Sequence, residues 1–261
     1  MNIKVIVAAH KKFAMPKDEM YLPLHVGKEG KEDIGYQGDN TGENISAKNP
    51  YFCELTGLYW AWKNLDADYI GLAHYRRHFT LAKKLPKEEE KKFELLLSKE
   101  QAEQILSDYD IILPKKREYY IENLYDHYKH SLHIETLDAA GEILREEYPE
   151  YYPEFENLKK RTGAHMFNMM IMSKPLFDAY CAWLFEILFE LERRIDPKQY
   201  DAFHARYPGR VSELLLDIWI RTNGLSYKEV PVADMQGVNW WKKGTAFLRA
   251  KFIGKKYDKS F

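Results

Sequence analysis

Cysteine is scarce in this chain, and neither sign of charge is in excess. Its 261 residues include two cysteines, Cys53 and Cys181, and each lies within an apolar helical pattern. Two separated thiols exclude a disulfide framework and a thiolate metal cluster. The formal net charge is −1, unlike the strongly basic balance of most nucleic-acid binders. We therefore expect no nucleic acid among the partners.

Long apolar runs are also missing. No apolar stretch reaches the roughly 18 residues that a bilayer span requires, and the sequence after Met1 lacks the apolar core of a signal peptide. We therefore expect a cytoplasmic protein. The sequence contains no P-loop, G-x-G-x-x-G, G-x-S-x-G or H-E-x-x-H motif. Their absence excludes the commonest kinases, dehydrogenases, serine hydrolases and zinc proteases.

Aromatic residues, by contrast, are abundant. They make up 15% of the chain, with 19 Tyr, 13 Phe and 6 Trp. Aromatic rings fill protein cores, and Tyr and Trp also provide flat faces on which sugar rings stack. The composition permits carbohydrate binding and is equally compatible with a Tyr-rich core.

Strand-like and helix-like segments alternate along the chain. Short apolar, β-branched runs predict strands, and apolar residues at helical spacing predict helices. The predicted strands cover Ile3–Ala9 and residues 21–26, 69–73, 109–113, 166–172 and 227–232. The predicted helices cover residues 50–65, 85–108, 173–194 and 211–222, with further helix within 119–152. This alternation predicts an α/β fold.

The chain divides by composition into a domain and a tail. Residues 1–238 carry the strand–helix alternation, and the charged stretch of about 85–160 forms a helical elaboration within them. Residues 239–261 hold seven Lys or Arg side chains against one acid, Asp258, with aromatic residues interleaved. Such a tail suits contact with an anionic membrane, which would place the protein at the inner face of the cell membrane. The same composition is equally compatible with a polar helix that packs on the domain.

The densest polar cluster directly follows the predicted strand at 69–73. It reads His74-Tyr75-Arg76-Arg77-His78. In open α/β sheets ligands bind at the carboxyl ends of the strands, and the fork of an arginine side chain matches a diphosphate. Side-chain alternation along extended backbone predicts that one of Arg76 and Arg77 points into the site and the other away. A surface turn whose arginines pair with carboxylates explains the cluster equally well.

Two further segments place polar groups near strand ends. Ala9 and His10 end the first predicted strand. A Gly-rich loop over residues 35–49 contains Asp39, Asn40 and Asn44, whose short side chains can hydrogen-bond a ribose or a base. They can equally form Asx turns within the loop itself.

Candidate acid–base and metal groups lie in helical segments. Glu213 and Asp217 are four residues apart and so share a face of a strongly apolar helix. A carboxylate in apolar surroundings has a raised pKa and can act as a general base, unless both side chains simply face solvent. His127, His130 and His133 recur every three residues. That spacing drifts around a helix and no carboxylate is fixed beside it, which disfavours a metal site.

Four segments of the sequence resemble a known family. They are GDNTGENISAKNPYFCELTGLYWAWKNLDADYIGLAHYRRHF, DYDIILPKKR, GAHMFNMMIMSKPLFDAYCAWLF and SELLLDIWI. Together they are similar to a bacterial family first catalogued as a domain of unknown function, over residues 4 to about 232. Members of that family occur among enzymes of capsule and exopolysaccharide synthesis, and some resemble galactofuranosyltransferases. The HYRR block with the upstream ELTGLYWAWKN helix is the specific part of the resemblance.

The resemblance implies a GT-A-like fold, a Rossmann-like, mixed and mostly parallel sheet flanked by helices. It implies transfer of galactofuranose or another hexose from a UDP-sugar to a glycan or lipid-linked oligosaccharide in surface polysaccharide synthesis, with residues of about 85–160 on the acceptor side. GT-A enzymes carry Asp-x-Asp after the equivalent of the strand at 69–73, where it binds Mn²⁺ or Mg²⁺ on the donor diphosphate. After the strand at 69–73 this sequence reads His74-Tyr75-Arg76, so the two Asp residues that would bind the metal are missing. We expect Arg76, with His74 or Arg77, to offset the diphosphate charge directly.

The resemblance also implies roles for residues elsewhere. Glu213, which opens a late predicted helix, takes the place of the catalytic base, with Asp217 as the reserve candidate. His165 and Asn168 are available to sugar hydroxyls. The remaining donor-site candidates are Ala9, His10, Asp39, Asn40, Asn44 and Tyr75. Two other functions stay compatible with the residues: a metal-dependent nucleotidyl- or phosphotransferase on the same sheet, and a non-catalytic carbohydrate-binding protein.

Overall fold

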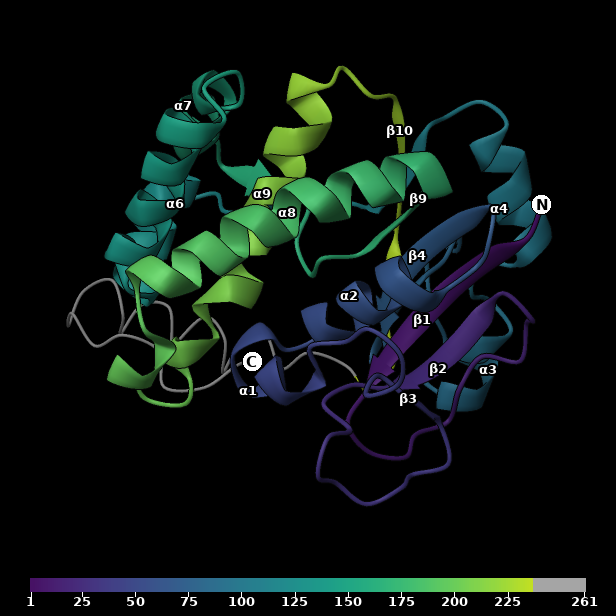
Figure 1. Ribbon diagram of the computed structural model, residues 1–261. Helices are drawn as coiled ribbons and strands as arrows, with labels where there is room; N and C mark the ends of the chain where they lie inside the picture. Colours follow the sequence, from purple (N-terminus) through teal and green to yellow (C-terminus); the bar gives the residue numbers. More distant parts are fainter. Residues whose placement is uncertain (237–261) are drawn as a thin grey trace.

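A nine-stranded sheet forms the centre of the molecule. The computed structural model describes residues 1–236 (Figure 1). Along the main path the strands are ordered β10 (Tyr227–Val230), β6 (Ile111–Pro114), β9 (Met170–Ser173), β4 (Tyr69–His74), β1 (Ile3–Ala9), β2 (Tyr21–His25) and β3 (Gln37–Gly38). β1 pairs in parallel with β2 and β4, and β6 with β10, whereas β9 runs antiparallel to β4 and β6. The predicted α/β fold with a mixed, mostly parallel sheet is confirmed.

The central strand β1 is buried on both of its faces. Ile6 and Ala8 pack into one hydrophobic cluster, and Val5 and Val7 pack into another. Successive side chains of a strand point to opposite faces, so a continuous apolar run fills two layers of core. The first cluster includes residues of α2 (Leu55–Asn64), α8 (Lys174–Arg194) and α9 (Tyr207–Thr222). The second includes residues of α4 (Lys99–Leu106), so helices cover both faces of the sheet.

A group of three helices lies beside the sheet. These are α5 (Leu124–Ser131), α6 (Ile134–Glu147) and α7 (Tyr152–Lys160). They contact one another, α6 and α7 contact α9, and α6 contacts α8. Figure 1 shows α6 and α7 on the opposite side of α9 from the strands. Within the stretch of about 85–160, α4 thus packs against β6 while α5 to α7 form this helical group.

Several predicted helices differ from the observed ones. The predicted helix over 50–65 is two helices, α1 (Asn49–Phe52) and α2, because Cys53 between them has a positive φ of 52°. The predicted helix over 85–108 is also two, α3 (Glu89–Phe93) and α4. Ser98 starts α4 anew, since its side chain accepts a hydrogen bond from the backbone of Gln101. α9 begins at Tyr207 rather than at 211.

Two predicted strands also change. The strand expected over 166–172 starts only at Met170, because Phe167 and Asn168 have positive φ angles of 79° and 54° that interrupt extended backbone. β4 runs on to His74, and after a two-residue turn the chain returns as β5 (Arg77–Phe79). β5 pairs antiparallel with β4 and with β11 (Val232–Asp234).

Short elements complete the described chain. β7 (Arg117–Glu118) and β8 (Gly163–Ala164) form a separate two-stranded sheet. Short 3₁₀ helices cover Ser46–Lys48, Pro197–Gln199 and His204–Arg206. Within residues 1–236, no helix combines the length and the apolar character that a membrane crossing demands. The predicted tail over 239–261 lies outside the described residues.

Candidate active site

A cavity of about 520 Å³ opens at the carboxyl ends of β1 and β4. Ala8 and His10 line it from the end of β1, and His74 lines it from the end of β4. The turn after β4 adds Tyr75 and Arg76. Open α/β sheets bind their ligands at this edge, and the volume falls in the range of roughly 300–1,000 Å³ typical of small-molecule sites.

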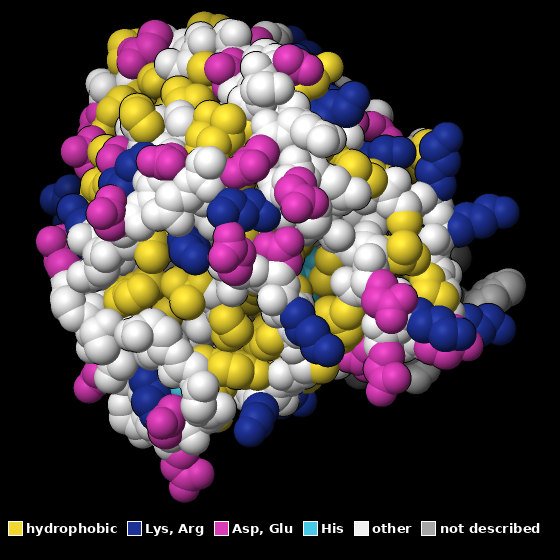
Figure 2. Space-filling view, turned by 90° about the vertical axis from the view of Figure 1, so that its right-hand side faces the viewer, with side chains coloured by type: hydrophobic (Ala, Val, Ile, Leu, Met, Phe, Trp, Pro, Cys, Tyr) yellow, Lys and Arg dark blue, Asp and Glu magenta, His cyan; other side chains and the backbone are white. Residues whose placement is uncertain are grey.

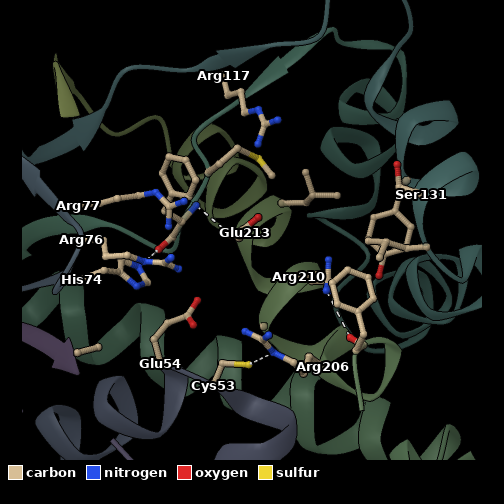
Figure 3. Close-up of a pocket in the computed structure, with 18 of the residues that line it drawn as sticks. Cys53, Glu54, His74, Arg76, Arg77, Arg117, Ser131, Arg206, Arg210 and Glu213 are labelled. Atoms are coloured by element: carbon tan, nitrogen blue, oxygen red, sulfur yellow. Dashed lines mark hydrogen bonds between the residues drawn. The ribbon is translucent and has the colours of Figure 1, made fainter. Parts of the chain in front are cut away.

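Arg76 and Arg77 both line the cavity (Figure 3). The expectation that only one of them faces the site is wrong, because the chain reverses at residues 75–76 and strand alternation does not continue across a turn. The guanidinium carbon of Arg77 lies 4.4 Å from the ring centre of Phe167. That of Arg76 lies 5.1 Å from the ring centre of Tyr75. Aromatic faces therefore hold both guanidinium groups and leave their edges open to a ligand.

Arg206, which directly precedes α9, and the first two turns of α9 provide a second polar edge. Arg206, Arg210 and Glu213 follow the spacing i, i+4, i+7, which places them on one helix face, and all three line the cavity. Sequence reasoning missed both arginines because it began this helix at 211. Pro208, a residue favoured in the first helical turn, was the available signal.

β7 and α5 close the remaining side of the cavity. Arg117 lines it from β7, and Tyr128 and Ser131 line it from α5. The Arg117 guanidinium carbon lies 5.0 Å from the ring centre of Tyr119, which also lines the cavity. The site thus lies between the sheet edge and the helical group (Figure 3).

The cavity wall is strongly cationic. It carries five arginines and two glutamates, namely Arg76, Arg77, Arg117, Arg206, Arg210, Glu54 and Glu213. Within residues 1–236, arginines in ion pairs with carboxylates occur at 161, 193 and 194, and none of the five in the cavity is among them. The outer face in Figure 2 instead mixes basic and acidic side chains. Arg206 donates to Sγ of Cys53 and Arg210 to the carbonyl oxygen of Phe203. A cavity whose guanidinium groups form no ion pair with a carboxylate of residues 1–236 is suited to an anion.

The surroundings of Glu213 shift its pKa toward neutral pH. Its Oε1 accepts a hydrogen bond of 3.1 Å from the backbone N–H of Phe167. Burial raises the pKa of Glu213 to about 7, the charge of Glu54 adds to the rise, and Arg210 opposes it. A carboxyl group with this pKa can accept a proton from an alcohol near neutral pH. Glu213 lies in the second turn of α9, not at the helix start as predicted, because the helix begins at Tyr207.

The segment 167–168 fixes two further cavity residues. Asn168 donates from Nδ2 to Oε1 of Glu54 at 2.8 Å. The Nε2 atom of His74 lies 2.6 Å from the carbonyl oxygen of Phe167, so this nitrogen carries the proton and donates. Burial lowers the pKa of His74, which favours a neutral ring. Compensation of a ligand's negative charge therefore falls to the arginines.

The loop carboxylate Asp39 lies inside the protein and not at the cavity. Its side chain is fully buried, at 0% exposure. It accepts hydrogen bonds of 2.5 to 3.0 Å from the backbone N–H groups of Gly27 and Lys28 and the hydroxyls of Ser46 and Thr56. Four donors fill its acceptor capacity, so Asp39 ties the polar loop to α2.

Asn40, Asn44 and Ala9 do not line the cavity either. Asn40 contacts Glu29 through Nδ2 at 3.4 Å. Asn44 accepts from the backbone of Ser46 at 3.1 Å, which is the Asx-turn alternative. Ala9 is fully buried, since it points away from the face on which its neighbour Ala8 meets the cavity.

His165 and Asp217 form a buried network behind the cavity wall. Asp217 accepts from the backbone N–H of His165 at 2.9 Å and contacts Nδ1 of the same residue at 2.5 Å. Glu229 contacts the other ring nitrogen at 2.9 Å. This network anchors the segment that carries Phe167 and Asn168. Of the two α9 carboxylates, Glu213 alone lines the cavity, because Asp217 lies one turn further along the helix.

No resident metal site is evident in the described chain. Within residues 1–236, no group of three His, Cys, Asp or Glu side chains is arranged to hold a metal ion. The histidines at 127 and 130 both contact Glu122, at 2.9 Å each. The expectation that no carboxylate is fixed beside them is therefore wrong, since the preceding loop folds back onto α5.

The sequence of the chain matches the model of a known family. The chain belongs to the family described as Domain of unknown function (DUF4422), whose model matches residues 4–224. The chain is also similar to a solved structure described as the apo structure of WbbM, a bifunctional glycosyltransferase. That match has 35% sequence identity and a TM-score of 0.83, and covers 91% of this chain. It covers 46% of the WbbM chain, so this chain spans less than half of that protein. No curated protein matches the sequence.

Proposed function

We propose that this chain is a glycosyltransferase that moves a hexose, galactofuranose or another, from a UDP-sugar onto a glycan or lipid-linked acceptor. The supporting observation is the cavity itself, which Arg76 and Arg77 at a strand end line together with Glu213. The family membership and the printed description of WbbM agree with this reading. Surface polysaccharide synthesis is the pathway that we infer from the resemblance.

In the proposed reaction the acceptor hydroxyl oxygen attacks the anomeric carbon of the donor sugar. The bond between that carbon and the β-phosphate oxygen breaks, and its electron pair leaves with UDP. Glu213 takes the hydroxyl proton, since its pKa of about 7 leaves part of it ionised at neutral pH. Arg76 and Arg77 offset the charge that develops on the leaving diphosphate.

The residues around Arg76 do not fit a resident metal ion. Guanidinium groups carry no lone pair for a metal. The two carboxylates that line the cavity, Glu54 and Glu213, already accept hydrogen bonds from Asn168 and from the backbone N–H of Phe167. We therefore propose that the arginines bind the diphosphate, and the proposed reaction includes no step at Mn²⁺ or Mg²⁺. The tail over 239–261 stays a proposed membrane contact.

Calorimetric titration with UDP, once with Mn²⁺ and once with EDTA, tests the proposal. We expect binding that survives EDTA in the wild type and falls about tenfold or more in Arg76→Gln, the cost of one charge-assisted pair. Arg145→Gln, an exposed position on α6, is the matched control and should bind as the wild type does. UDP binding that is equal in Arg76→Gln contradicts the assignment. Binding and nucleotide turnover that both need the metal would favour the nucleotidyl- or phosphotransferase instead.

A further inference from the structure

Four of the five cavity arginines form two pairs on either side of Glu213, and the fifth, Arg117, lines the wall formed by β7. Arg76 and Arg77 come from the turn that ends β4. Arg206 and Arg210 come from the start of α9, and Arg117 comes from β7. Figure 3 shows Arg76 and Arg77 on one side of the cavity, with Glu213 toward its centre and Arg210 and Ser131 beyond it.

Electrostatic coupling follows the same division. Burial lowers the pKa of Arg77, and the charge of Arg76 lowers it further. Burial likewise lowers the pKa of Arg210, and there the next cause is Arg206. Glu213 opposes the fall at both arginines. Arg76 with Arg77, and Arg206 with Arg210, are thus two pairs of like charges held close together, and both pairs lie near Glu213. Asp234 and Glu54 also oppose the fall at Arg77.

The second pair and its surroundings have buried polar atoms to satisfy. Nε of Arg210 and Oγ of Ser131 are buried and have no hydrogen-bond partner within residues 1–236. Ser131 is 3% exposed and lines the cavity on the side of α5. The guanidinium of Arg210 lies 4.0 Å from the ring centre of Phe203, which holds it in place. Buried donors without acceptors are costly, so this arrangement is typical of a site that a ligand completes.

We propose that Arg117, Arg210 and Ser131 form a second anion site, which binds a negatively charged group on the acceptor. The role of this site rests on the proposed sugar transfer, whereas the binding of an anion there does not. The acceptor's reacting hydroxyl must reach Glu213, so the rest of the acceptor extends toward α5, away from Arg76 and Arg77. A neutral glycan needs only neutral hydrogen-bonding groups. Arginines here instead suit a phosphate ester or the carboxylate of a uronic acid.

Calorimetry with inorganic pyrophosphate as the probe tests the second site. We expect two pyrophosphates per chain in the wild type and one when the protein is saturated with UDP. Arg117→Gln should lower the affinity of the UDP-saturated protein for pyrophosphate about tenfold or more, with Arg145→Gln as the control. Arg117 and Arg210 are both half-buried, but Nε of Arg210 is itself buried, so Arg117→Gln carries the smaller folding risk. A single pyrophosphate per chain, displaced fully by UDP, would overturn the proposal.

Further titrations identify the anion that binds and test separately whether the proposed sugar transfer holds. The UDP-saturated protein is titrated with phenyl phosphate and with methyl glucuronide, and the ligand that Arg117→Gln weakens identifies the anion. If neither binds, the acceptor role is wrong. If UDP does not bind, but one pyrophosphate binds and Arg117→Gln weakens its binding, the anion site is supported and the proposed sugar transfer is contradicted. Equal loss of UDP affinity in Arg117→Gln and Arg76→Gln would place Arg117 in the donor site and overturn the second anion site.

Discussion

Asp39 is a fully buried carboxylate and Glu213 a half-buried one at the cavity, and their surroundings differ sharply. Asp39 accepts four hydrogen bonds from the loop and α2. Glu213 accepts one, from Phe167, and otherwise faces a cavity lined with arginines. A buried charge whose hydrogen bonds are complete holds structure together, and one whose capacity is left open can serve a ligand. The same distinction separates Asp217, bonded to His165, from Glu213 on one helix.

The largest effect should come from Glu213→Gln. The amide keeps the shape and can still meet the Phe167 N–H through its oxygen, but it cannot accept the acceptor proton. We expect the rate of sugar transfer to fall about a hundredfold or more, as is typical for loss of a general base. UDP affinity, measured by calorimetry on the same sample, should stay within about threefold by our estimate. A rate near that of the wild type would remove Glu213 from the chemistry, and Asp217→Asn would then be tested.

Asp39→Ala should act on stability instead. The change leaves four donors around the 27–56 region without their acceptor. We expect the free energy of unfolding to fall by about 3 kcal/mol or more, because each buried unsatisfied group costs about 1–3 kcal/mol. Denaturant unfolding measures this, with the exposed Asp33→Ala as a control expected within about 0.5 kcal/mol of the wild type. If Asp39→Ala is as stable as the control but loses UDP affinity, the loop belongs to the donor site after all.

The pH dependence of the sugar-transfer rate should shift in Glu54→Gln. Glu213 must be ionised to act as a base, so transfer should rise with pH through its pKa of about 7. The charge of Glu54 contributes to that raised pKa, and its removal should lower the pKa of Glu213. The acidic limb of the kcat/KM profile should therefore move toward lower pH. A limb that does not move, or that persists in Glu213→Gln, would mean that another group titrates.

Much of the fold was predictable because, in many segments, the residue pattern of the sequence matches the strand or helix that is buried there. The β-branched run at Ile3–Ala9 fits a strand buried on both faces, and β1 has these bounds. Pro175 near the start of a long apolar pattern fits α8. The break at Cys53 was not predictable, because its positive φ occurs at a residue that is neither glycine nor proline.

The candidate site was predictable only where it follows a strand. The cluster at 74–77 comes directly after β4, and position alone indicates a ligand edge. Arg117, Arg206 and Glu54 are brought to the cavity from distant segments by the fold. Asp39 and Asn40 share the loop composition of a binding site, but composition does not reveal that Asp39 finds its donors up to 17 residues away. The number of hydrogen-bond donors around each carboxylate separates structural from functional carboxylates here, and it can be counted only in the folded structure.

The smallest expected effect is on thermal stability, again at Glu213. Its folded-state pKa of about 7 lies above the ordinary value of 4.5. A carboxyl group with a raised folded-state pKa stabilises the fold below the unfolded pKa, and this contribution is lost as pH rises through the folded pKa. At pH 8 the wild type therefore bears the cost of an ionised Glu213, and Glu213→Gln should raise Tm by about 2–4 °C. Near pH 4 the two proteins should melt together. A variant that is less stable than the wild type at pH 8 would show that the cavity arginines, in the absence of substrate, depend on Glu213 as their counterion, and that its carboxylate is not held in reserve for catalysis.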